Sequence, residues 1–346
     1  MYMNHGIIFC IWIESNFFQG EINMYLAGDI GGTKTHLALY EKKNTTYIPI
    51  KQKKFPSGSY VSLEKILKEF LSSSEKIEKA CFGVAGPVHQ GRCETPNLAW
   101  IIDEEILKKE LKTEKVSLIN DLVANAYGIR TLSEKDFFIL NEGTAGMEGN
   151  QAIVSAGTGL GEVGLFFDGQ HHSPFASEGG HCDFFVRNKE EANLFFYLQK
   201  KYGDHVSLER VLSGPGLENI YEYLITTYSE GQSFLEKTKE KSLAQIVSEK
   251  GLSKECFFCE KALDLFTSFY GAEAGNSVLK FYALGGLFIG GGIAPKILEK
   301  LKTSIFMNAF TAKGRMGSLL STISVKVILN EETALLGSSY YAKHIL

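Results

Sequence analysis

Two stretches of this sequence repeat one pattern, and that pattern limits the folds available to the chain. Residues 26–41 read LAGDIGGTKTHLALYE, and residues 153–169 read IVSAGTGLGEVGLFFDG. In each, an apolar run enters a turn of glycines and threonine, and a second apolar run leaves it. Apolar runs on both sides of a glycine turn predict two paired strands. The same device used twice predicts a duplicated fold.

The segments around these hairpins alternate between strand and helix patterns. Residues 61–74 carry apolar side chains at helical spacing, whereas KACFGVAGP at 79–87 is typical of a buried strand that ends in a turn. VSLIN at 116–120 predicts another strand, followed by a helix from Asp121. Strands that alternate with helices predict an α/β fold. We also expect helices at 103–111, at 189–203, after 214–216 up to 228, at 256–284, after Pro295 and at 332–343, and a solvated helical insertion at 229–255.

Composition narrows the class of protein. A chain of 346 residues has room for two domains or one large one, and its charged content of 22% is ordinary for a globular protein. The net charge of −4 gives no electrostatic reason to expect nucleic acid or an anionic membrane as partner. The six cysteines are scattered, which fits a reduced, cytoplasmic protein. Cys256 and Cys259 lack the further ligands of a zinc site, so we expect two half-buried thiols on a helix.

The N-terminal segment carries a short apolar run, GIIFCIWI at 6–13. The run is too short to span a bilayer. No lysine or arginine precedes it, as a signal peptide would require. We expect residues 1–23 to be a poorly ordered extension, or the natural chain to start at Met24.

Four short stretches rich in glycine are candidates for contact with a ligand. Residues 31–33, 157–161 and 290–292 directly follow apolar strand patterns, and the fourth stretch is 214–216. Glycines at strand ends let backbone N–H groups approach an anion, and a threonine hydroxyl adds a donor. None has the spacing of a Walker loop or of GxGxxG. Each alone would be interpreted as a plain turn, but three together favour a nucleotide.

Polar side chains at three places are candidates for chemistry. Asn120 and Asp121 lie where a strand passes into a helix, which is where α/β folds place ligands, although Asp121 could also merely cap the helix. Glu178 and His181 flank two glycines. A polar loop facing a hydroxylated ligand fits this pair better than a metal-binding helix does. Glu209, taken alone, is interpreted as a charge on a helix surface.

Nine segments, in one order from about Met24 to LLGS at 335–338, carry a resemblance over nearly the whole chain. They are GDIGGTKTHLAL (28–39), FGVAGPV (82–88), PNLAW (96–100), INDLVANAYG (119–128), SAGTGLG (155–161), SEGGHCDF (177–184), ERVLSGPGLENIY (209–221), GGIAPK (291–296) and KGRM (313–316). Together they resemble the bacterial glucokinases, within the superfamily of sugar kinases and actin. The related ROK sugar kinases carry a cysteine-rich zinc motif beside the histidine. Here Cys182 stands alone, which indicates the zinc-free branch.

The resemblance implies a fold and an assembly. We expect two actin-like, ribonuclease H-like α/β domains with a central cleft. The small domain would cover residues 24–131 and be completed by the C-terminal helix at 331–346, and the large domain would cover 132–330. The family commonly forms homodimers. Its members are cytoplasmic and need neither nucleic acid nor membrane as partner.

The resemblance also implies roles for particular residues. Asp121 would bind the sugar and act as the catalytic base that takes the proton of its 6-hydroxyl, and Asp29 would help place Mg²⁺ through water. Lys34, where many relatives carry asparagine, could touch a phosphate or point outward. The other sugar hydroxyls would be held by Asn97, Asn120, Glu178, His181 and Glu209. ATP would be held by Gly31, Gly32, Thr33 and Lys34, by Gly157, Thr158, Gly159 and Gly161, and, at the nucleoside, by Gly290, Gly291 and Gly292.

The implied activity is ATP-dependent phosphorylation of D-glucose to glucose 6-phosphate, the first step of glycolysis. Fold-level analogy does not separate glucose from glucosamine, N-acetylglucosamine or mannose as the acceptor, nor ATP from polyphosphate as the donor. A sugar-independent actin-like ATPase would not need Asn97, Glu178, His181 and Glu209 together. A sugar-sensing repressor would need a DNA-binding domain of about 60 residues before the first glycine turn, and we do not expect one.

Overall fold

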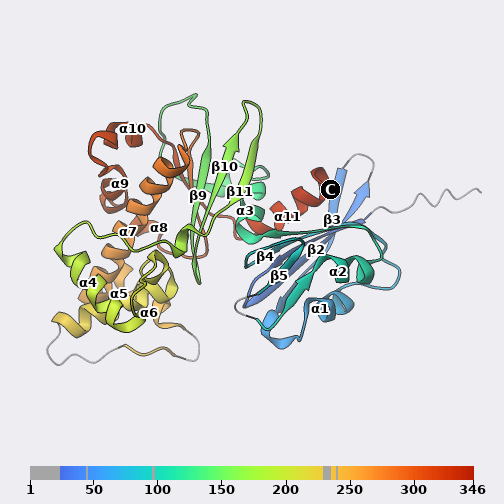
Figure 1. Ribbon diagram of the computed structural model, residues 1–346, viewed down its shortest axis with the longest axis horizontal. Coiled ribbons are helices and arrows are strands. Elements are labelled where there is room, and N and C mark those ends of the chain that lie inside the picture. The colour runs from blue at the N-terminus through green and yellow to red at the C-terminus, as the bar shows by residue number, and fades with distance from the viewer. Residues whose placement is uncertain (1–23, 44–45, 96–97, 229–234, 239–240) are drawn as a thin grey trace, which may run out of the picture.

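Two β-sheets organise the molecule (Figure 1), and the computed structural model describes residues 24–43, 46–95, 98–228, 235–238 and 241–346. The first sheet has the strand order β3-β2-β1-β4-β7. Its strands are β1 (Met24–Ile30), β2 (Lys34–Lys43), β3 (Thr46–Pro56), β4 (Ile77–Val84) and β7 (Lys115–Asn120). The chain segment that connects β4 to β7 contains two short strands, β5 (Arg92–Glu94) and β6 (Ile101–Asp103), which form a separate antiparallel pair.

The second sheet repeats the topology of the first. Its order is β11-β10-β9-β12-β13-β8. In each sheet, three strands that are consecutive in the chain form an antiparallel meander. On the other side of the first of these strands, the sheet continues with two further strands that run parallel to it. The duplicated fold predicted from the two hairpins is therefore confirmed. The strands are β8 (Phe137–Asn141), β9 (Gln151–Ala156), β10 (Leu160–Phe167), β11 (His172–Ala176), β12 (Leu287–Gly290) and β13 (Val325–Ile328).

Helices cover both faces of each sheet because alternate strand residues point to opposite sides. In β1, Leu26 packs in the core beneath α1 (Leu63–Phe70) and α2 (Glu104–Leu111), whereas Tyr25 and Ala27 pack towards α11 (Thr333–His344). The second sheet is covered on one face mainly by α5 (Gly214–Tyr228) and α7 (Phe257–Phe281). The remaining helices are α3 (Asp121–Ile129), α4 (Lys189–Tyr202), α6 (Leu243–Leu252), α8 (Leu298–Leu301), α9 (Ser304–Thr311) and α10 (Gly317–Ser321).

Helices α3 and α11 lie between the two sheets (Figure 1) and pack against each other. A Cβ on Gly337 would lie only 1.7 Å from Ala124 O, so glycine is what permits this close crossing. The helix α11 is fastened to the first sheet by hydrogen bonds from Tyr25 to Ser339 (2.8 Å) and from Gly83 N to Ser338 Oγ (3.1 Å). The other side of α3 packs on the second sheet through Ala126. Helix α11 therefore packs against the first sheet.

Three local predictions differ from the structure. In the described part of the charged segment 229–255, α6 is the one helix that lies wholly within it, and Val247 packs that helix against α5 and α7 instead of leaving it solvated on all sides. Residues 214–216 do not precede α5 but form its first turn, since the N–H groups there need no intrahelical partner. Cys259 is fully buried, not half-buried, and Cys256 caps α7.

Residues 1–23, predicted to be an N-terminal extension, and Asn97, predicted to bind the sugar, lie outside the described residues. Within the described part of the chain, no helix has both the length and the apolar character needed to cross a bilayer.

Candidate active site

Asp121 is positioned by the junction between β7 and α3. The side chain of Asn120 accepts hydrogen bonds from Leu122 N (2.9 Å) and Val123 N (3.4 Å), so Asn120 is the residue that caps the helix. This excludes the simple capping role considered for Asp121. Asp121 Oδ1 also lies 2.9 Å from Leu122 N, at the positive end of the helix dipole.

Carboxyl groups from distant parts of the sequence lie close to Asp121. Burial, the charge of Asp29 and that of Glu178 raise the pKa of Asp121 to about 7. Burial likewise raises the pKa of Asp29 to about 6, against the opposing charge of Lys34. Asp29 lies on β1 opposite Gly83 of β4, and Asn120 on β7 lies opposite Val84. Asp29 and Asp121 therefore lie at the carboxyl ends of two parallel strands, β1 and β7, on either side of β4.

The first glycine turn, between β1 and β2, is closed by a hydrogen bond of its own and supported by Ser57, which follows β3. Gly31 N donates to Lys34 O (2.9 Å), which makes the turn tight. Ser57 donates through its hydroxyl to Gly31 O (2.7 Å) and through its N–H to Thr33 O (3.1 Å). Thr33 is exposed at the tip, and Lys34 lies close enough to Asp29 to lower the pKa of that carboxyl group.

The second glycine turn packs against Glu209 and against Leu122, the residue that follows Asp121. Leu160 N donates to Glu209 Oε2 (2.9 Å), and a Cβ on Gly159 would lie 2.5 Å from the same oxygen. A Cβ on Gly161 would lie 2.4 Å from Leu122 Cδ1, directly after Asp121. Glu209 is therefore not the free surface charge that its local sequence suggests. Its partner lies 49 positions away in the chain, where no local pattern could reveal it.

The glycines at 290–292 and 214–216 both lie beside the second turn. Gly291 has a φ of 82°, and a Cβ there would lie 2.2 Å from Ala156 O. Gly214 N donates to Gly157 O (2.8 Å). Tyr270 on α7 lies 2.9 Å from Gly290 O and accepts from Ala156 N (3.2 Å), which ties the ends of β12 and β9 together. Three of the four glycine stretches thus converge at one end of the second sheet.

Glu178 and His181 border a short 3₁₀ turn at Gly179–His181. Glu178 Oε2 and His181 Nε2 are 3.9 Å apart, and both side chains are more than half exposed. The two glycines are needed for packing, since a Cβ on Gly180 would lie 2.0 Å from Leu160 O and one on Gly179 would lie 2.3 Å from Glu162 Oε2. The contact between Leu160 and Gly180 joins this polar loop to the second glycine turn.

A family model described as Glucokinase matches residues 26–345. The chain belongs to the glucokinase family. The glucokinase of Trichormus variabilis is 39% identical over 344 residues, covering 94% of this chain and the whole of that protein. The glucokinase of a Synechocystis species is also 39% identical, covering 92% of this chain and 97% of that protein.

Solved structures agree with the family assignment. The crystal structure of a glucokinase from an Antarctic psychrotroph has a TM-score of 0.79 at 30% identity, covering 92% of this chain and 98% of the other. A glucokinase from Balamuthia mandrillaris, crystallised with glucose, has the same TM-score at 20% identity and supports the fold alone. The predicted fold class of two actin-like α/β units is confirmed.

Some supporting residues were not found from the family's sequence segments. Ser57 braces the first turn, Tyr270 joins two strand ends, and Glu162 lies beneath Gly179. Only Glu162 had a local signal: it is an acid within an otherwise apolar strand, GLGEVGLFF at 159–167. The other two act through partners that are distant in the sequence.

The acids of this site suit a magnesium ion that also binds phosphate. In the described part of the chain, no three His, Cys, Asp or Glu side chains cluster as a metal centre built from protein ligands alone would require. Mg²⁺ commonly binds through one or two carboxylates together with water and substrate phosphates. The buried carboxyl groups of Asp29 and Asp121 fit that limited role, because a divalent cation would offset their mutual repulsion.

Proposed function

We propose that this chain is a glucokinase that transfers the γ-phosphoryl group of ATP to the 6-hydroxyl of D-glucose. The observation that carries the proposal is the placement of Asp121 at the start of α3, close to Asp29 and Glu178, in a chain of the glucokinase family. A carboxyl group in this position can orient a hydroxyl group and accept its proton.

Asp121 is the proposed catalytic base. Phosphoryl transfer passes through a loose transition state, so alignment and charge stabilisation contribute more than early proton removal. A pKa raised to about 7 makes Asp121 a stronger proton acceptor than an exposed aspartate while leaving much of it ionised at neutral pH. It would receive the proton late, as the new bond to phosphorus forms.

The sugar would be held by side chains on the two loops beside Asp121. Glu178 and His181 present an acceptor and a donor to vicinal hydroxyls, and ionised carboxylates form strong charge-assisted hydrogen bonds with them. Glu209 keeps one oxygen on Leu160 N and would offer the other to the sugar. Asn97 and Asn120 complete the proposed set, although the side-chain oxygen of Asn120 is already engaged by α3.

ATP would lie between the two glycine turns. The N–H groups and threonine hydroxyls at 31–33 and 157–161 would donate to its phosphates, and residues 290–292 would lie against the nucleoside. Lys34 would add a positive charge on the phosphate side, which its proximity to Asp29 supports. Mg²⁺ placed by Asp29 through water would supply neutralisation of the phosphate charge.

The assembly proposed for this enzyme follows its family. We assign residues 24–131 with the C-terminal helix at 331–346 to a small domain around the first sheet, and residues 132–330 to a large domain around the second. We further propose that the enzyme is a cytoplasmic homodimer that closes around its substrates. Closure would exclude water, which otherwise competes for the phosphoryl group.

A coupled assay of ADP release over a panel of hexoses tests the proposed function. We expect turnover with ATP and glucose to exceed that with mannose, glucosamine or N-acetylglucosamine, and polyphosphate to replace ATP poorly. A preference for another hexose would move the chain to that kinase activity. ATP turnover that is independent of every sugar would overturn the proposal in favour of an actin-like ATPase.

A further inference from the structure

The carboxyl group of Glu162 in β10 lies behind the loop that carries Glu178 and His181, and the mechanism above leaves it unused. Glu162 is only 1% exposed. A Cβ on Gly179 would lie 2.3 Å from Glu162 Oε2, so the backbone of the loop rests directly on this carboxyl group. Ser177 Oγ donates to the main-chain oxygen of Glu162 (3.1 Å) and accepts from Gly179 N (3.3 Å). Glu162 therefore fastens the loop to β10, in addition to the contact between Gly180 and Leu160.

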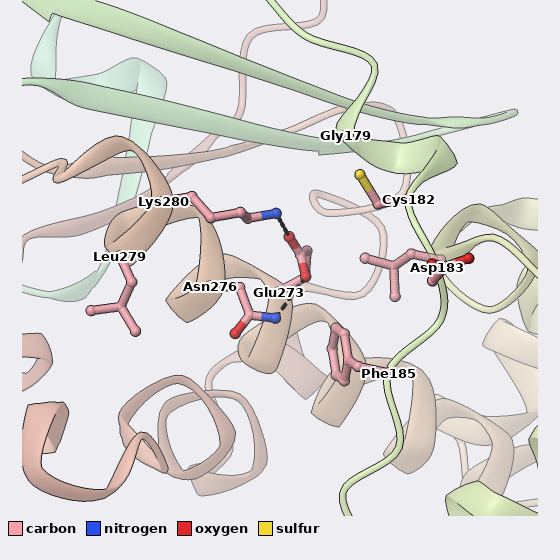
Figure 2. A pocket seen from close by; sticks show the side chains of 9 residues that line it. Gly179, Cys182, Asp183, Phe185, Glu273, Asn276, Leu279 and Lys280 are labelled. Atoms are coloured by element: carbon pink, nitrogen blue, oxygen red, sulfur yellow. Dashed lines mark hydrogen bonds and ion pairs between the residues drawn. The ribbon is translucent and has the colours of Figure 1, made fainter.

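Helix α7 holds Glu162 from the other side. Lys280 Nζ lies 3.4 Å from Glu162 Oε2 and 2.6 Å from Glu273 Oε1, so one lysine bridges two buried carboxyl groups. Glu273 Oε2 accepts from Asn276 Nδ2 (2.9 Å), and Lys313 donates to Asn276 Oδ1 (2.5 Å). Figure 2 shows Glu273 between Lys280 and Asn276, with both contacts drawn.

A cavity of about 240 Å³ separates the loop from much of α7. Figure 2 shows the side chains of the loop on one side of this space and those of α7 on the other. The cavity leaves part of the loop without close packing behind it. The position of the loop therefore depends more strongly on its contact with Glu162. Residues that line the cavity are Gly179, Cys182, Asp183, Phe185, Leu208, Glu273, Asn276, Leu279 and Lys280.

The protonation of Glu162 matters for this contact. Burial and the charge of Glu273 raise the pKa of Glu162 to about 8, against the opposing charge of Lys280. The group is then mostly neutral at pH 7. A neutral group suits this place, since Glu162 Oε1 is buried without a hydrogen-bond partner among the described residues. The charged groups that face it are Glu273 and Lys280, with Lys313 beyond Asn276.

We propose that Glu162, held by Lys280 and Glu273, is a positioning residue that sets the place of Glu178 and His181 and thereby the enzyme's affinity for its sugar. The inference rests on the proposed function, because it takes the loop at 178–181 as part of the sugar site. It assigns Glu162 no contact with the substrate. Its effect reaches the sugar through the backbone at Gly179.

Substitution at position 162 separates this role from general stability. We expect Glu162→Ala, which removes the support beneath Gly179, to raise KM for glucose at least tenfold at pH 7 while KM for ATP stays within twofold. Glu162→Gln keeps the volume and imitates the neutral acid, so its KM for glucose should stay within threefold of wild type. Raising the pH above 8 should increase KM for glucose in the wild type but not in Glu162→Gln.

Glu191→Ala is the matched control. Glu191 is also 1% exposed and forms an ion pair with Arg187 (2.6 Å), but it lies on α4 and does not touch the sugar loop. It should lower thermal stability without moving KM for glucose. Where Glu162→Ala does not fold, Lys280→Met provides the same test, because it removes the cation that holds both carboxyl groups. We expect it to raise KM for glucose in the same selective way.

Equal increases in both KM values, or an unchanged KM for glucose in Glu162→Ala and Lys280→Met, would overturn the inference and leave the proposed function intact. A wild-type enzyme that phosphorylates no hexose would overturn both. If the wild type prefers another hexose, the same comparison is made with that sugar, and the same selective change in KM is expected.

Discussion

At the scale of single residues, the most informative groups are two buried acids at the carboxyl ends of strands, Asp29 and Asp121. Burial raises the pKa values of both Asp29 and Asp121, and the charge of Asp29 raises the pKa of Asp121 further. Two buried carboxyl groups close together lower the stability of the folded state when both are ionised. The same arrangement is useful for catalysis, because a bound cation or a proton taken from the substrate reduces the repulsion between them. Function and stability are therefore in conflict at position 121.

Asp121→Ala tests the catalytic side of this conflict. We expect glucose binding to remain within about tenfold of wild type, because Glu178, His181 and Glu209 still hold the sugar. Turnover should fall by several orders of magnitude, since no other carboxyl group is placed to take the proton of the 6-hydroxyl. Calorimetric glucose binding and steady-state kinetics measure the two effects. A kcat close to that of the wild type would contradict the assignment of the base.

Asp121→Asn tests the stability side. The unfolded pKa of an aspartate is about 3.9, and the folded value is about 7. Between these pH values the folded state keeps a proton that the unfolded state has released, so stability falls as pH rises through this window. Asparagine cannot ionise, so without ligands the variant should gain of the order of 1–3 kcal/mol at pH 8. At pH 4 the gain should vanish.

Thermal unfolding at the two pH values measures that gain as a rise of a few degrees in Tm. Glu209→Gln is a useful comparison, because Glu209 is an acid of the same site whose oxygen already accepts a backbone hydrogen bond. It should show no such gain at pH 8. A gain for Asp121→Asn that is equal at both pH values would point to packing instead of charge.

At the scale of elements, close backbone contacts position the site. Helix α3 carries Asp121 at its first turn, crosses α11 at Gly128 and Gly337, and packs its other side on the second sheet. The second glycine turn is held between α3 and Glu209 by contacts that leave no room for a Cβ at Gly159 or Gly161. Small residues here set distances between elements, and those distances set the site.

Gly337→Ala tests the crossing of the two central helices. The added Cβ would lie 1.7 Å from Ala124 O, a backbone atom that cannot rotate away, so α11 must shift from α3. We expect a loss of at least about 2 kcal/mol in unfolding free energy, in the upper range for overpacking. Gly58→Ala is the matched control, since no atom lies within 4 Å of its Cβ position. Chemical denaturation of both variants should show a loss only at position 337.

At the scale of the whole molecule, the two sheets carry different parts of the proposed site. The first sheet supplies Asp29, Asp121 and one glycine turn, and the second supplies the other glycine stretches and the loop at 178–181. Helix α3 contacts both sheets, and α11 packs against α3 and the first sheet. A sugar and a nucleotide bound across this junction would link the two halves through their own contacts.

Ligands should therefore stabilise the folded protein as a whole. Glucose at about 100 times its dissociation constant should add about 2.7 kcal/mol to the unfolding free energy. Adding a non-hydrolysable ATP analogue with Mg²⁺ should add more than the two ligands contribute separately, because each favours the closed arrangement. Thermal unfolding measures these shifts, with L-glucose at the same concentration as the control for solvent effects. Stabilisation by L-glucose equal to that by D-glucose would contradict a stereospecific sugar site.

Local sequence sufficed for most of the elements, whereas the roles of the candidate residues rest on the resemblance to the family and stay predictions. The two hairpins, the alternation of strands and helices and the long helix α7 are all encoded by patterns within short windows, because burial on one face imposes a period on the sequence. The glycine turns were found the same way. Local patterns gave the wrong picture where a partner is distant in the sequence, as for Glu209 with Leu160 and for α6 with its neighbours.

What the sequence determined by itself is the set of elements, the duplicated pattern and the family. What only the tertiary structure decided is which polar groups lie close together: the charges of Asp29 and Glu178 raise the pKa of Asp121, and Glu162 lies beneath Gly179. The physical reason is the sequence distance over which each kind of interaction acts. Periodicity and turn chemistry act over a few neighbouring residues, whereas desolvation and Coulomb interactions depend on distances that exist only once the two sheets have packed.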